Sequence, residues 1–111
     1  MLPQFTRDFF GNQALLKVVC PVCHYNYVHV EDAYTVPGHD AYKAWAGRGD
    51  CIRVPFWAEC GHVFELCFGF HKGETFLFIE VIPVPEAAED EDAAMFDALD
   101  QARARAAALA Q

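Results

Sequence analysis

The sequence contains no long hydrophobic run. A membrane-spanning helix needs about 18 or more consecutive apolar residues, and no stretch of these 111 residues approaches that length. The first residues include Arg7 and Asp8 and lack an apolar run followed by a cleavage site, so they do not resemble a signal peptide. These two absences predict a protein of the cytoplasm with no membrane partner.

Basic residues are scarce. The chain has 8 Lys and Arg against 16 Asp and Glu, which gives a net charge of −8. Nucleic-acid-binding surfaces carry clustered Lys and Arg, so direct binding of DNA or RNA is disfavoured. A local patch formed by Lys43, Arg48, Arg53 and Lys72 is the arrangement that would support a nucleic-acid-associated regulator instead.

Catalytic signatures are also lacking. The sequence has no Ser-His-Asp signature, no phosphate-binding glycine loop and no His-Glu-x-x-His motif. Cys67 and His71 would face the same way on a strand, but four residues of strand span about 13 Å. That separation is too large for a nucleophile and its base. We therefore expect a protein that is not an enzyme.

Cysteine is present, in an odd number and in a pattern typical of metal sites. Five cysteines cannot all pair within one chain, and a reducing compartment disfavours disulfides. The turn Cys20-Pro21-Val22-Cys23 offers two thiolates, which is half of a tetrahedral zinc site. The turn at Cys60-Gly61-His62 offers a third thiolate.

The second turn is incomplete, because Trp57 stands three residues before Cys60, where a second cysteine is expected. His62 is the preferred fourth ligand, since residues 60 and 62 share one face of a strand. Cys51 and His71 remain alternatives. The predicted metal ligands are thus Cys20, Cys23, Cys60 and His62, holding Zn²⁺. The competing interpretation is a degenerate site in which Trp57 fills the space of the metal and the cysteines are simply buried.

Periodicity predicts a mostly β (α+β) fold: an antiparallel sheet of about four to five strands with a C-terminal α-helix. Residues 64, 66, 68 and 70 alternate with their neighbours over 63–70, which is typical of a strand. Pro55 indicates an edge strand or a bulge, and Asp40 is a candidate N-cap for a short helix. The remaining expected strands are 14–19, 25–30, 52–58 and 75–84, and the expected short helix is 41–46.

The length supports a single domain with two parts. Residues 1–85 form the β domain, with an N-terminal arm or helical turn at 1–13 and a long loop at 31–50. Residues 86–111 form an acidic amphipathic helix, with its helical part over 92–110. The apolar stripe of this helix comprises Met95 or Phe96, Leu99, Ala102, Ala106 and Leu109, and its first half is predicted to dock on the body while the end of the helix frays. The alternative is a helix that projects and serves as a handle for a basic partner or for self-association.

Taken in order, the cysteine turns and strands over residues 14–80 resemble a zinc ribbon. More narrowly, they resemble small uncharacterised zinc-ribbon proteins of bacteriophages and bacterial mobile elements. The resemblance rests on the two cysteine turns, on Ile52-Arg53-Val54 leading to the second turn, and on the His71-Lys72-Gly73 turn that follows. It implies a ribbon fold with bound zinc, and it carries over no catalytic residues and no established activity.

The expected function is therefore a small, non-enzymatic, zinc-ribbon-like protein-binding module, an accessory protein of a phage or mobile element acting in the host bacterial cytoplasm. Its partner would be host machinery or a second copy of itself. Two alternatives stay open: a nucleic-acid-associated regulator that uses the ribbon for recognition, and an acidic mimic of nucleic acid.

Overall fold

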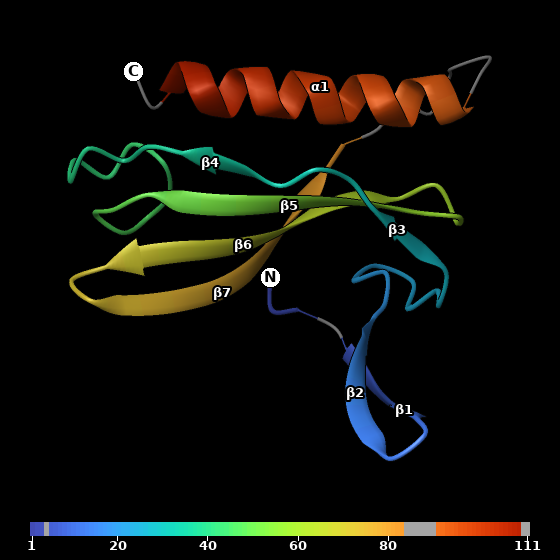
Figure 1. Ribbon diagram of the computed structural model, residues 1–111. Helices are drawn as coiled ribbons and strands as arrows, with labels where there is room; N and C mark the ends of the chain where they lie inside the picture. Colours follow the sequence, from blue (N-terminus) through green and yellow to red (C-terminus); the bar gives the residue numbers. More distant parts are fainter. Residues whose placement is uncertain (4, 84–90, 110–111) are drawn as a thin grey trace.

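In the computed structural model, which describes residues 1–3, 5–83 and 91–109, the chain forms two antiparallel sheets and one C-terminal helix. The expected mostly β fold with a C-terminal helix is therefore confirmed (Figure 1). The described part of the chain contains no helix that is both long and apolar enough to cross a membrane.

The first sheet is a two-stranded hairpin, β1 (Phe5–Phe10) and β2 (Gln13–Val18). The prediction of an arm or helical turn over residues 1–13 is wrong in its secondary structure. The signal for a hairpin was present, because Gly11 and Asn12 connect the two strands and Gly11 adopts φ 58°. Glycine reaches this left-handed region without a steric penalty.

The second sheet has five strands. Its centre is β5 (Cys51–Ala58), which pairs with β6 (Val63–His71), and β6 pairs in turn with β7 (Glu74–Ile82). On its other side β5 pairs with two short strands, β3 (Val28–Val30) and β4 (Tyr34–Val36).

Pro55 lies inside β5, so the expectation of an edge strand is wrong, whereas the alternative of a bulge fits the register. Between the pairs Val30–Phe56 and Tyr34–Arg53, the three residues 31–33 face only two residues of β5. The backbone of Pro55 faces the β3–β4 side of the sheet, where its carbonyl accepts a hydrogen bond from the Glu31 amide at 2.8 Å. This position falls in the gap between β3, which ends at Val30, and β4, which begins at Tyr34. The missing N–H of proline therefore costs no ladder bond to β6.

Residues 31–50 are not a single loop, because they contain β4. The helix expected over 41–46 does not form, and the segment is a series of turns. Its backbone explains why: His39, Asp40 and Tyr42 all have φ between 53° and 60°. A right-handed helix cannot pass through residues in the left-handed region.

The sheet of β5, β6 and β7 has two faces, since neighbouring side chains on a strand point in opposite directions. Helix α1 (Glu91–Leu109) packs on one face, where Ala98, Leu99 and Ala102 join Val63 and Ile82 in a buried cluster. We call this side of the sheet the covered face. The predicted docking of the helix is confirmed for Leu99 and Ala102. The side chains of Met95 and Leu109, and the boundary predicted at residues 85–86, lie outside the described residues.

The opposite side of the sheet carries only apolar residues on β5, β6 and β7 apart from Thr75, and we call it the apolar face. Hairpin β1–β2 extends away from this side (Figure 1), and its base packs there through Phe5 and Val18. The members of the apolar face are Ile52, Val54, Phe56, Phe64, Leu66, Phe68, Phe70, Leu77, Ile79 and Val81.

Candidate metal centre

Two turns from distant parts of the sequence meet beside the sheet. The first follows β2 and is closed by the His24 amide, which donates to the Cys20 carbonyl at 2.9 Å. The second connects β5 to β6, where the Gly61 amide donates to the Ala58 carbonyl, also at 2.9 Å. Each is a tight turn that presents cysteine side chains on one side.

The backbone after each turn takes the same unusual conformation. Gly61 follows Cys60 with φ 99°, and His24 follows Cys23 with φ 62°. Glycine adopts this left-handed conformation freely, whereas at His24 a residue with a Cβ adopts it at some cost in strain. The amide two residues after each of these cysteines, in Tyr25 and in His62, hydrogen-bonds to the cysteine sulfur. The two turns therefore share the same geometry after their last cysteine, although the first turn is one residue longer.

The four residues predicted as metal ligands come together. The Sγ atoms of Cys20, Cys23 and Cys60 and a ring nitrogen of His62 all lie within 4.8 Å of one another. Cys60 Sγ is 3.2 Å from Cys23 Sγ and 3.3 Å from His62 Nδ1. Cys20 Sγ lies 3.4 Å and Cys23 Sγ 3.7 Å from the same nitrogen.

These distances suit a tetrahedral ion. Bond lengths of about 2.3 Å for sulfur and 2.1 Å for nitrogen place the ligand atoms of a zinc site about 3.6–3.8 Å apart. Three thiols and one imidazole are the donors that zinc prefers. The cluster is therefore able to hold a metal ion such as zinc.

The thiols also show the effect of their crowding. A hydrogen bond shared with Cys60 lowers the pKa of Cys23 to about 7. Desolvation raises the pKa of Cys60 to about 12, and the hydrogen bonds from its cysteine neighbours add to this. Without a cation, the thiolate of Cys23 is stabilised by the thiol of Cys60, whose own ionisation becomes less favourable. A bound divalent ion stabilises all the thiolates together.

Trp57 lies away from this cluster. Its ring stacks on His29 with a centroid distance of 4.1 Å, and its Nε1 donates to Glu31 at 3.1 Å. It also packs against the cluster under α1 and contacts Phe96. The interpretation in which Trp57 fills the space of the metal is therefore wrong.

The alternative fourth ligands are also placed elsewhere. Cys51 is buried on the covered face with Cys67, and His71 Nδ1 accepts a hydrogen bond from the Arg48 amide at 3.0 Å. Neither belongs to the cluster that His62 completes. The sequence had indicated His62 on the expectation that residues 60 and 62 share a strand face. The structure places both in the turn between β5 and β6, and the turn itself brings them together.

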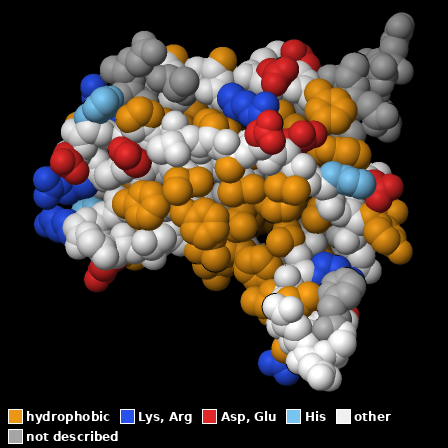
Figure 2. Space-filling model, in the orientation of Figure 1, with side chains coloured by type: hydrophobic (Ala, Val, Ile, Leu, Met, Phe, Trp, Pro, Cys, Tyr) orange, Lys and Arg blue, Asp and Glu red, His pale blue; other side chains and the backbone are white. Residues whose placement is uncertain are grey.

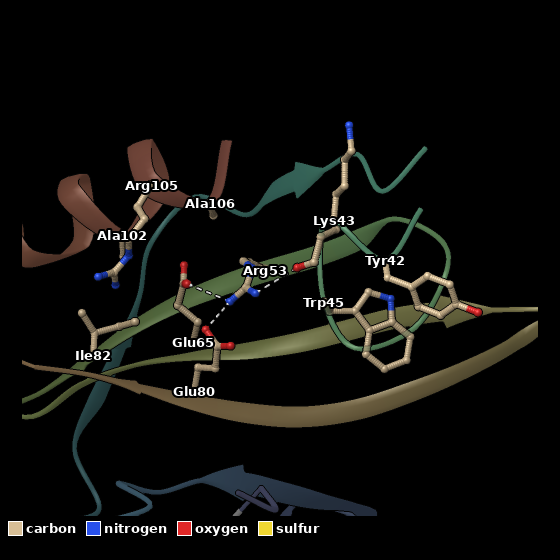
Figure 3. Close-up of a pocket in the computed structure, with 11 residues that line it drawn as sticks. Tyr42, Lys43, Trp45, Arg53, Glu65, Glu80, Ile82, Ala102, Arg105 and Ala106 are labelled. Carbon is tan, nitrogen blue, oxygen red and sulfur yellow. Dashed lines mark hydrogen bonds and ion pairs between the residues drawn. The ribbon is translucent and has the colours of Figure 1, made fainter. Parts of the chain in front are cut away.

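A second concentration of charge lies on the covered face, in a cavity of about 380 Å³ under α1. Figure 3 shows Arg53 between the side chains of Glu65 and Glu80, with Tyr42 and Trp45 contributed by the turns before β5. Arg53 donates to Glu80 at 2.7 Å and lies 3.4 Å from Glu65. Its other terminal nitrogen donates to the Ala44 carbonyl at 3.3 Å.

This network explains how charges are tolerated on the covered face. Burial acts to lower the pKa of Arg53, but the hydrogen bond and charge of Glu80 raise it overall. Burial raises the pKa of Glu65, whose side chain is 1% exposed, and Arg53 partly offsets that effect. The network joins the turns before β5 to the sheet and contains no nucleophile paired with a base.

Arg53 is therefore unavailable to the basic patch considered from the sequence. A patch for nucleic acid needs exposed cations, whereas this guanidinium is enclosed by carboxylates and a carbonyl. That prediction for Arg53 is wrong, because the sequence does not show which residues of β5 face the core.

Comparison of the chain with family models, with curated proteins and with solved structures gives no match. What the structure itself defines is a mostly β protein with a Cys₃His cluster able to hold a metal ion.

Proposed function

We propose that the protein is a zinc-stabilised, non-enzymatic protein-binding module. The observation that carries this proposal is the convergence of Cys20, Cys23, Cys60 and His62 from two turns. With four protein ligands the coordination shell of zinc is complete, which is typical of structural rather than catalytic sites.

The zinc would act as a cross-link between the two sheets. Cys20 follows β2 by two residues, and Cys60 and His62 lie in the turn between β5 and β6. Four metal–ligand bonds would fix the base of hairpin β1–β2 against the five-stranded sheet. Because such a site is absent in the unfolded chain, metal binding would add directly to folding stability.

The apolar face supports the protein-binding part of the proposal. In Figure 2, hydrophobic side chains gather over the middle of the sheet, bordered by charged groups on one side and the hairpin on the other. Leu77 and Val81 are exposed there, and Ile52 and Phe68 are only half-buried. Contiguous apolar patches of this kind mark interaction sites. The resemblance to zinc-ribbon accessory proteins of phages and mobile elements remains part of this proposal.

The first test is the metal content of protein purified without added zinc. We expect about one zinc per chain, as a single four-ligand site requires, and its loss from both Cys23→Ser and His62→Ala. Matched controls outside the cluster, Cys51→Ala and His24→Asn, should keep the metal. A folded parent protein without zinc would contradict the metal part of the proposal.

The second test addresses binding. A protein that stays monomeric at high concentration and also retains no partner from a bacterial lysate would contradict the protein-binding part, whatever its zinc content.

A further inference from the structure

Hairpin β1–β2 exposes apolar side chains on the same face that meets the sheet. In the register of the hairpin, Phe5 and Val18 lie on one face with Leu16 and Phe9, and Arg7, the partner of Leu16, lies on that face too. Phe5 and Val18 pack on the body at the base of the hairpin. Toward the tip, Phe9 is 61% exposed and Leu16 is 67% exposed. The packing surface thus continues outward beyond the body of its own chain.

The apolar face shows the complementary arrangement. The hairpin base covers its inner part, where Phe56, Phe64 and Ile79 are buried. Its outer part is left open, with Leu77 39% exposed and Phe70 half-buried. One chain therefore carries exposed apolar side chains on its hairpin and on the apolar face, and Figure 1 shows the hairpin extending from that side of the sheet.

We propose that the partner of the apolar face is a second copy of this chain, with each hairpin β1–β2 lying on the apolar face of the other copy. This inference rests on the protein-binding part of the proposed function and assigns its surface and its partner. A two-fold axis relates the two contacts, so the interface is closed and the assembly stops at a dimer.

Charge supports this pairing of surfaces. Residues 1–18 contain Arg7, Asp8 and Lys17 and have a net charge of +1. The net charge of the whole chain is −8, so the remaining residues carry −9. Two such bodies repel each other when they meet directly. The hairpin is the part of each copy that the acidic body of the other attracts.

Area supports it as well. One apolar patch of about 300–600 Å² is common on monomers, whereas a stable interface buries about 1,200–2,000 Å² in total. A reciprocal exchange buries two hairpin surfaces and two sheet surfaces at once. A contact between two sheets, or between two hairpins, would use only one surface of each copy.

The test measures the mass of the zinc-loaded full chain by sedimentation and light scattering over a wide concentration range. We expect a dimer whose dissociation constant rises about tenfold or more in Leu16→Glu, at the hairpin tip, and in Leu77→Glu, on the apolar face. Both side chains are exposed in the single chain, so their thermal unfolding and zinc content should stay close to those of the parent. Tyr42→Glu, an exposed aromatic residue in the turns before β5, is the control and should dimerise normally.

Mixing the two variants separates this dimer from the alternatives. Each variant alone has both contacts damaged, but a mixed dimer keeps one intact contact, between the unaltered hairpin and the unaltered face. The mixture should therefore associate more tightly than either variant alone. Normal dimerisation of Leu16→Glu would overturn the proposal in favour of sheet-to-sheet packing, and normal dimerisation of Leu77→Glu would overturn it in favour of hairpin pairing.

A parent chain that is monomeric at every concentration also overturns the proposal. If that monomer holds zinc and binds another protein, the proposed function stands and only the second-copy partner is wrong. If it holds no zinc and binds no protein, the proposed function is wrong too.

Discussion

The two faces of the β5–β7 sheet are made by alternate residues of the same three strands, yet they have opposite relations to solvent. The covered face contains the charged residues Arg53 and Glu65, and it lies beneath α1 and the turns before β5. Among the described residues, the hairpin base packs on the apolar face, and the Met1 carbonyl accepts a hydrogen bond from the Ile79 amide of β7 at 2.8 Å. An antiparallel sheet usually places its apolar side inward and its polar side in water.

The difference shows that the covered face was buried by pairing its charges with one another, although Arg53 Nε and Glu65 Oε2 have no hydrogen-bond partner among the described residues. Arg53 makes four contacts to oxygen or sulfur atoms of its neighbours, and these include Glu65 and Glu80. The apolar face needs no such network, because any apolar surface can cover it. The helix and the turns before β5 therefore cover the face with specific polar requirements, and part of the apolar face stays exposed.

The largest effect is expected from breaking the charge network of the covered face. Arg53→Ala should lower the free energy of unfolding by about 3–5 kcal/mol, because it leaves Glu65 buried without its counter-charge. Urea unfolding followed by circular dichroism measures this. Lys72→Ala, in the exposed turn between β6 and β7, is the control and should change stability by less than about 0.5 kcal/mol. Equal effects of the two substitutions would mean that the network is not structural.

The next largest loss of stability is expected from a substitution in α1, the helix that packs on the covered face. Leu99 is 1% exposed at the centre of the contact between α1 and the sheet. Leu99→Ala should destabilise the protein by about 3 kcal/mol through lost burial and a cavity. Gln101, exposed on the same helix, offers the matched control Gln101→Ala. A helix that contributes little to the fold would give the same unfolding midpoint for both variants.

A smaller loss of stability is expected from adding a side chain at Gly69, which lies against Trp45 on the covered face. A Cβ added at Gly69 would stand 2.4 Å from the Trp45 ring, which also packs against Phe76 and Phe78. Gly69→Ala should therefore cost about 1–3 kcal/mol, as overpacking does. The change should be accompanied by a shift in tryptophan fluorescence, and unchanged fluorescence and stability would place Trp45 elsewhere.

A still smaller effect is expected on the apolar face of the isolated chain. Leu77→Ser, measured at concentrations low enough to favour the monomer, should change stability by less than about 1 kcal/mol because Leu77 is already exposed. Chemical unfolding at low and high protein concentration distinguishes the effect of Leu77→Ser on the stability of the single chain from its effect on association. A loss as large as that of Leu99→Ala would show that the apolar face is covered within one chain.

The smallest effect is a change of stability with pH. Burial raises the pKa of Glu65 above its ordinary value of 4.5, so the folded state binds the proton more tightly than the unfolded state. The contribution of Glu65 to stability is then greatest below its ordinary pKa and falls as the pH rises through the folded value. Glu65→Gln cannot titrate, so the parent should lose stability relative to this variant from about pH 4 upward. A difference that is constant with pH would contradict the shift.

Much of the fold could be predicted because local signals agreed with it. Alternation over residues 63–70 identified β6, and the composition after residue 90 identified α1. The errors lie where a local preference was ambiguous. A proline inside a strand excludes a central position only if its nitrogen points toward a residue of a paired strand. The sequence does not show in which direction the backbone nitrogen of Pro55 points. Asp40 resembles a helix cap, but its own backbone is left-handed.

The sequence by itself determined the three thiols of the Cys₃His cluster and favoured His62 as the fourth donor, because the Cys-Pro-x-Cys and Cys-Gly-His spacings are local and their turns follow from short-range geometry. Only the tertiary structure decided that these turns meet, that Trp57 points to the helix, and that Arg53 is enclosed. Strand pairing and the covering of each face depend on contacts between residues far apart in the chain. A pattern with period two specifies the two faces of a strand but not which of them a helix will cover.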